Sequence, residues 1–116
     1  MHGNMKKLER DILNWIAARC GDQSLAEQCR QATAPFREYT GVGVFVTLEV
    51  PESVEVCGLA RAPEVPYPYV NSPDLEYGAG CVLFLEDGRL DTLEIFAYGD
   101  SFPEDIDDYV LEDRDA

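Results

Sequence analysis

Glu94 is the residue of this chain best suited to acid–base chemistry. It lies in the apolar run 93–96, whose composition predicts a β-strand. A carboxylate on an apolar face needs a hydrogen-bonding partner or has a raised pKa. Tyr39 and Tyr98 could orient a ligand beside it. The alternative is that Glu94 is a solvent-exposed strand acid and that both tyrosines are half-buried, with their hydroxyls in water.

The direction of Glu94 depends on the turn at Asp87-Gly88. With a two-residue turn, Glu94 pairs with Cys81 and shares a face with leucines that are typical of a core. With a three-residue turn and a bulge, the register slips by one residue and Glu94 pairs with Gly80. The sequence leaves both registers open.

A dense group of carboxylates near the C-terminus is the second candidate site. Its members are Asp100, Glu104, Asp105, Asp107 and Asp108. They lack the alternating oxygen ligands and the glycine of a calcium loop. They form either a solvated acidic surface or a docking surface for a cationic protein partner, whose association they would steer.

Other common catalytic arrangements find no support. His2 is the only histidine, and the four cysteines have wide, irregular spacings. We therefore expect no metal, no cofactor and no catalysis through a histidine-activated nucleophile. The Gly41-Val42-Gly43 segment comes where a strand begins, so it predicts a bulge or a close backbone approach and not a phosphate loop.

Charge limits the partners. The chain has 116 residues and a net charge of −14, and 46% of its residues are hydrophobic. Residues 1–50 carry six basic and six acidic residues, whereas residues 51–116 carry three and seventeen. This balance disfavours nucleic acid and anionic membrane as partners. No apolar stretch of signal-peptide type follows Met1, so we expect a cytoplasmic protein with free thiols.

The periodicity predicts helices first and strands afterwards. Apolar residues recur at helical spacing over 5–20, with Glu9 and Arg10 on the solvent side, and a capping box at Ser24 begins a second helix that ends before Pro35. Strands are predicted at 42–50 and more weakly at 54–59. The Pro- and Tyr-rich stretch 61–77 reads as an irregular loop. Asp87-Gly88 joins a hairpin of 81–85 and 89–98, and residues 106–111 could form a short helix or an edge strand.

This order predicts an α+β fold in which two N-terminal helices pack on one face of an antiparallel β-sheet with a C-terminal Asp-Gly hairpin. We expect one domain, 1–116, with a helical part at 1–34, a sheet part at 35–111 and an acidic tail at 112–116. Exposed sheet edges would allow a homodimer.

Two segments carry a resemblance. The strand start Tyr-Thr-Gly-x-Gly at 39–43 and the Leu-Glu-x-x-x-Tyr-Gly stretch at 93–99 resemble motifs of a group of small, uncharacterised, single-domain bacterial proteins. The resemblance covers residues 36–111 and marks Tyr39, Glu94 and Tyr98, with Phe102 where a tryptophan often stands. By its type, such a protein is similar to immunity partners of bacterial toxins.

Two functional hypotheses follow. The first is a non-catalytic protein-binding domain, of the immunity or antitoxin type, that binds a basic toxin. The second is a small-molecule-binding protein or weak enzyme, with a pocket between the sheet and the loop 61–77 and with Glu94, Tyr39 and Tyr98 as its polar groups. A mimic of nucleic acid ranks below both, because the acids form no long regular array.

Overall fold

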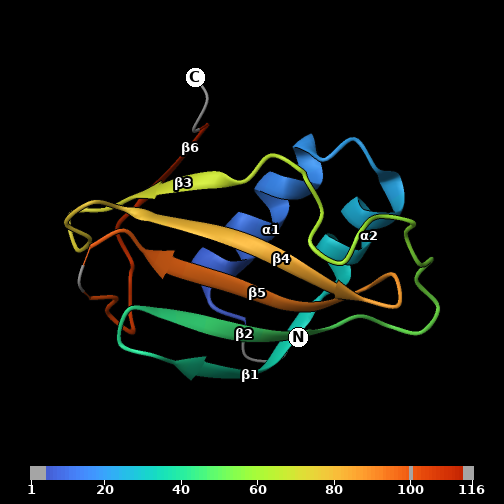
Figure 1. Ribbon diagram of the computed structural model, residues 1–116, viewed down its shortest axis with the longest axis horizontal. Helices are drawn as coiled ribbons and strands as arrows, with labels where there is room; N and C mark the ends of the chain where they lie inside the picture. Colours follow the sequence, from blue (N-terminus) through green and yellow to red (C-terminus); the bar gives the residue numbers. More distant parts are fainter. Residues whose placement is uncertain (1–4, 100, 114–116) are drawn as a thin grey trace.

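The protein is an α+β domain of two layers, seen in a computed structural model that describes residues 5–99 and 101–113. Two helices, α1 (Lys7–Arg19) and α2 (Gln23–Gln31), precede all the strands. Both helices lie on the same side of one sheet, behind it in the view of Figure 1. Helices segregated from an antiparallel sheet define the predicted fold class.

The sheet has six strands in the order β1-β2-β5-β4-β3-β6, and all its described pairings are antiparallel. Its strands are β1 (Thr33–Tyr39), β2 (Gly43–Glu49), β3 (Pro68–Asn71), β4 (Ala79–Glu86), β5 (Arg89–Ala97) and β6 (Val110–Asp113). The long β4–β5 hairpin forms its centre, and β1 and β6 form its edges.

Turn chemistry accounts for the two tight hairpins. Asp87 and Gly88 have φ values of 53° and 79°, the positive angles that a two-residue turn between β4 and β5 requires. In the β1–β2 turn, Gly41 has φ of 92°. A Cβ on Gly43 would stand 2.4 Å from the carbonyl oxygen of Ile95, so the predicted close backbone approach is confirmed.

The core lies between the helices and one face of the sheet. Leu8, Ile12, Leu13 and Ile16 of α1 are buried, as their spacing predicts. They face alternate residues of the central strands, namely Val44, Val46 and Leu48 of β2, Leu83 and Leu85 of β4, and Leu93 and Ile95 of β5. Because strand side chains alternate, the intervening residues point away from the helices.

Several expected boundaries were wrong. Strand β1 begins at Thr33, inside the expected helical part, and β3 lies inside the stretch expected to be an irregular loop. Residues 54–59 form no strand. Helix α2 is capped by Asp22, whose carboxylate accepts the Leu25 amide at 2.8 Å, and not by Ser24.

The C-terminal segment ends as the edge strand β6, one of the two predicted alternatives. Residues 112 and 113 belong to this strand and not to a tail. Asp100 and residues 114–116 of the expected tail lie outside the described residues.

Candidate functional site

The three residues predicted to share a pocket are not brought together. Tyr39 pairs with Val44, which faces the helices as Val46 and Leu48 do, so Tyr39 lies on the helix-covered side of the sheet. Glu94 pairs with Phe45 and Val82, and these positions face away from the helices. Tyr98 follows on the same side as Glu94 and is 38% exposed.

Neither expected register of Glu94 occurs. The hairpin begins with a two-residue turn, because Glu86 pairs with Arg89, but a bulge falls between the Leu85–Leu90 and Phe84–Thr92 pairs. The extra residue, Asp91, moves Glu94 opposite Val82 and turns its side chain out of the core. A partly exposed strand acid was the alternative considered from the sequence.

The surface on which Glu94 lies is the most distinctive feature of the molecule, and no described helix or strand covers it. We call it the outer face. It consists of the non-glycine residues of β1, β2, β5 and β4 that point away from the helices: Phe36 and Glu38 of β1, Phe45, Thr47 and Glu49 of β2, Arg89, Thr92, Glu94 and Phe96 of β5, and Val82, Phe84 and Glu86 of β4.

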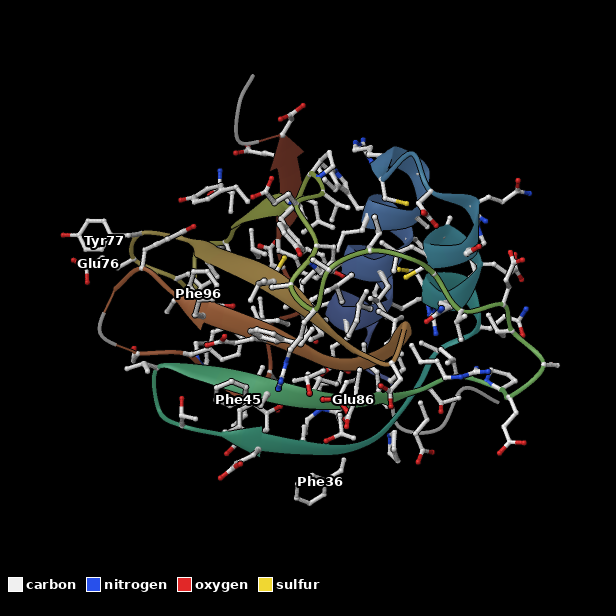
Figure 2. All side chains as sticks on the ribbon, turned by 45° about the vertical axis from the view of Figure 1, so that its right-hand side comes forward. Phe36, Phe45, Glu76, Tyr77, Glu86 and Phe96 are labelled. Atoms are coloured by element: carbon white, nitrogen blue, oxygen red, sulfur yellow. The ribbon has the colours of Figure 1, made fainter. Side chains whose placement is uncertain are left out.

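Aromatic side chains run across this face. Phe36 is 63% exposed and Phe45 is 39% exposed, while Phe84 and Phe96 are half-buried. Figure 2 shows Phe36, Phe45 and Phe96 on three neighbouring strands, with Glu86 at the hairpin end of the sheet. An antiparallel sheet with one solvated face ordinarily carries polar residues there, so these phenylalanines depart from the usual pattern.

The charge of the outer face is one-sided. Its acidic residues are Glu38, Glu49, Glu86 and Glu94. Among the described outward positions of these strands, the basic residue is Arg89. The guanidinium of Arg89 is held by the carbonyl oxygens of Pro51 and Glu52, at 3.1 and 3.0 Å. The face therefore offers carboxylates beside aromatic rings.

The acidic run near the C-terminus lies elsewhere. Phe102 and Ile106 are buried against the core on the helix side, which places Glu104, Asp105 and Asp107 around the start of α1, while the Asp108 carbonyl accepts a hydrogen bond from Ser72 just after β3. The Lys6 ammonium donates to the Glu104 carbonyl at 2.8 Å and to the Asp105 carboxylate at 3.0 Å. These acids and the outer face are thus separate surfaces.

A cavity of about 210 Å³ opens beside these acids, with Lys6, Tyr39 and Phe102 among its lining residues. Its polar groups bind one another, since the Tyr39 hydroxyl donates to the Glu104 carbonyl at 3.1 Å. The Tyr39 hydroxyl raises the pKa of Lys6, against the lowering effect of burial, and Asp105 adds to the rise. This arrangement fastens the C-terminal segment to α1.

Sequence reasoning missed a buried ion pair next to this cavity. Glu9 is 3% exposed and accepts two hydrogen bonds from the Arg37 guanidinium of β1, as well as the Lys6 amide at 2.8 Å. The expectation that Glu9 faces solvent was wrong, and Arg10 is half-buried. Arg10 donates to the carbonyls of Cys29 and Ala32, at 2.8 and 2.6 Å. These carbonyls lie at the end of α2, where the helix itself supplies no amide to pair with them.

A second link joins the C-terminal segment to α1. The Tyr109 hydroxyl and the Lys7 ammonium both donate to the Asp11 carboxylate, at 2.5 and 2.9 Å. Burial alone would raise the pKa of Asp11, but these hydrogen bonds outweigh burial and leave that pKa below its usual value.

In the described residues we find no site suited to cysteine chemistry or to metal binding. All four cysteines are free thiols, and burial raises the pKa values of Cys29 and Cys81 to about 12. No group of three or more histidine, cysteine or acidic side chains in the described part of the chain could hold a metal ion. In the same residues, no helix has the length and apolarity to cross a bilayer.

Comparison of the chain with protein-family models, with curated proteins and with solved structures finds no significant match. The resemblance of its strand and hairpin motifs to small bacterial proteins therefore stays a prediction.

Proposed function

We propose that this protein is a non-catalytic protein-binding domain that docks a basic, partly apolar surface of another protein on its outer face. The observation that carries the proposal is a set of four phenylalanines, interspersed with threonine and glutamate, on a sheet face that no described helix or strand covers. Contiguous exposed apolar surface on a soluble domain marks interaction sites. Aromatic residues are also the side chains most enriched in protein interfaces.

Charge complementarity selects the partner. Four carboxylates lie among the aromatic side chains, and the guanidinium of Arg89 is already engaged by backbone carbonyls. A nucleic acid would be repelled by this surface. A partner with lysine or arginine side chains around an apolar patch would satisfy both the rings and the carboxylates.

An immunity-type role fits this chemistry. The resemblance implies a partner of a bacterial toxin, and a basic toxin would present the required charge. The outer face would then cover the functional surface of the toxin, while the helices and the C-terminal segment hold the sheet in shape.

Site-specific photo-crosslinking tests the proposal. A photoreactive phenylalanine analogue replaces Phe36 or Phe45 on the outer face, and Gln23 or Ala18 on the exposed side of the helices serves as the matched control. In the cells that make the protein, we expect the outer-face positions alone to give one discrete adduct with a basic protein. Adducts at the control positions only, adducts between two copies of the chain, or no adduct would each overturn the proposal.

Binding kinetics of the same complex distinguish residues that dock the partner from residues that only attract it by charge. Replacing Phe45 and Phe96 by serine should raise the dissociation rate at least tenfold, because interface anchors act mainly on dissociation. Changing Glu104, Asp105, Asp107 and Asp108 together to amides should lower the association rate at low salt and leave the dissociation rate unchanged, because these acids lie off the docking surface. A large rise in the dissociation rate of this second variant would place the partner on the helix side instead.

A further inference from the structure

A second cavity, of about 260 Å³, lies where the chain enters the sheet at β3. Strand β3 pairs with β4 at Val70–Ala79, and the preceding segment 65–68 lines the cavity opposite β4. Gly80 and Cys81 of β4, Phe96 of β5 and Tyr98 complete the lining. Phe96 belongs to the outer face, so the cavity is continuous with the proposed docking surface.

The aromatic walls of this cavity are held in place before any partner arrives. The Tyr67 hydroxyl donates to the Pro63 carbonyl at 2.8 Å and accepts the Leu83 amide at 3.2 Å. The Phe96 and Tyr98 rings meet edge to face, with centroids 5.6 Å apart. Rigid walls reduce the entropy lost on binding.

Glycine at position 80 makes room for these rings. A Cβ there would stand 2.4 Å from the Tyr98 hydroxyl oxygen and 2.8 Å from the Phe96 ring. On its other side, the Tyr98 ring stacks on Tyr69 with the ring planes 16° apart. The absence of a side chain at Gly80 thus makes room for Phe96 and Tyr98, which line the cavity together with Tyr67.

Among the described residues, no charged residue lines the cavity itself, and acidic residues occupy nearby positions on the strands and the entering segment. Glu94 occupies the next outward position along β5 from Phe96, and Glu112 of β6 lies directly opposite Tyr69. Glu64 immediately precedes the lining segment 65–68. Aromatic rings with carboxylates around them are the environment that attracts an organic cation.

We infer that this aromatic cavity is the anchor pocket of the docking surface and that it takes an arginine side chain of the partner protein. The inference rests on the proposed function and names the chemistry that the outer face recognises. The volume of 260 Å³ is below the ~300–1,000 Å³ typical of ligand clefts, so it suits one side chain. A planar guanidinium stacks on tyrosine and phenylalanine rings while its N–H groups reach carboxylates.

An NMR titration tests the pocket without the partner. The probe is arginine blocked at both ends, and the matched ligand is the equally blocked citrulline, which has the same shape and no charge. We expect saturable shifts at Gly80, Phe96 and Tyr98 with the arginine probe, and none with the citrulline probe. Equal binding of both probes would show an apolar pocket, and no shift with either would show no pocket; each result overturns the inference.

Variants and a third ligand complete the design. Tyr98→Leu should weaken binding of the arginine probe about tenfold, whereas Phe36→Leu, at the far end of the outer face, should leave it unchanged. Glu94→Gln, a milder change at a half-exposed residue, should weaken binding about threefold, and it serves as the test if Tyr98→Leu perturbs the fold. Preferential binding of tetramethylammonium would assign the pocket to a free small cation and overturn the inference.

The titration and the crosslinking experiment fail independently. Crosslinks from the outer face without arginine binding would keep the proposed function and remove the anchor pocket. Arginine binding without crosslinks would show a cation pocket that no protein partner uses.

Discussion

Breaking the buried ion pair between Arg37 and Glu9 should destabilise the domain by about 3–5 kcal/mol. The side chains of Arg37 and Glu9 are 14% and 3% exposed. In Arg37→Met, the Glu9 carboxylate loses both guanidinium hydrogen bonds and keeps the Lys6 amide among its described partners. A buried charge without a partner destabilises the folded state far more than an exposed one, and this difference sets the expected loss in the free energy of unfolding.

Urea unfolding measures this change. With a slope of about 1–3 kcal/mol per molar urea, the loss should lower the midpoint by roughly 2 M. The double variant Glu9→Leu with Arg37→Met removes both charges, so it should be more stable than Arg37→Met alone. A cost below about 1 kcal/mol for Arg37→Met, or a double variant whose cost equals the sum of the two single variants, would refute the reasoning.

Three further outcomes follow from the described contacts. Gly43→Ala should destabilise the domain by about 1–3 kcal/mol in urea unfolding, because its Cβ would meet the Ile95 carbonyl and the strands must move apart. Asp11→Asn should lower stability at pH 7, and its effect should shrink in acid; the pKa of Asp11 is depressed in the folded state, so its contribution is present above the unfolded pKa and is lost as pH falls through the folded pKa. At pH 8, Cys29 and Cys81 should react with a thiol reagent only after denaturation, because their pKa values of about 12 leave almost no thiolate; rapid labelling of either in the native protein would contradict the burial.

Elements with a strong local signal were predicted correctly. The β4–β5 hairpin follows from Asp87-Gly88, since few other residue pairs accept two successive positive φ angles. Helix α1 follows from apolar residues at 3.6-residue spacing. In these places the chain's own chemistry determines the structure, so no knowledge of distant residues is needed.

Elements that depend on distant partners were missed. Strand β1 contains Pro35 and alternates weakly, and it forms because β2 pairs with it. Strand β3 is held between β4 and β6, which lie 8 and 39 residues further along the chain. Local propensity is a weak guide where a neighbouring strand supplies the hydrogen bonds.

The site residues show the same limit more sharply. One bulge at Asp91 decides that Glu94 faces outward opposite Val82, whereas the bulge considered from the sequence belonged to a three-residue turn and placed Glu94 opposite Gly80. Glu9 looks like a solvent residue on the helix, because the sequence does not show that Arg37 will lie beside it. The aromatic outer face, in contrast, has a local signal: Phe45 alternates with core valines where a polar residue is usual.

In the proposed function, the outer face and the acids near residue 105 have different roles. The field of the net charge of −14 reaches ~30 Å at 0.01 M salt but only ~8 Å at physiological salt, so acids away from the outer face attract a cationic partner mainly at low salt. Attraction of this kind brings no particular orientation. Orientation needs groups fixed at short range, and the described residues place aromatic rings beside carboxylates on the outer face, next to the pocket at Gly80. The acids near residue 105 are tied to Lys6 and the start of α1, so they contribute charge while the sheet contributes shape.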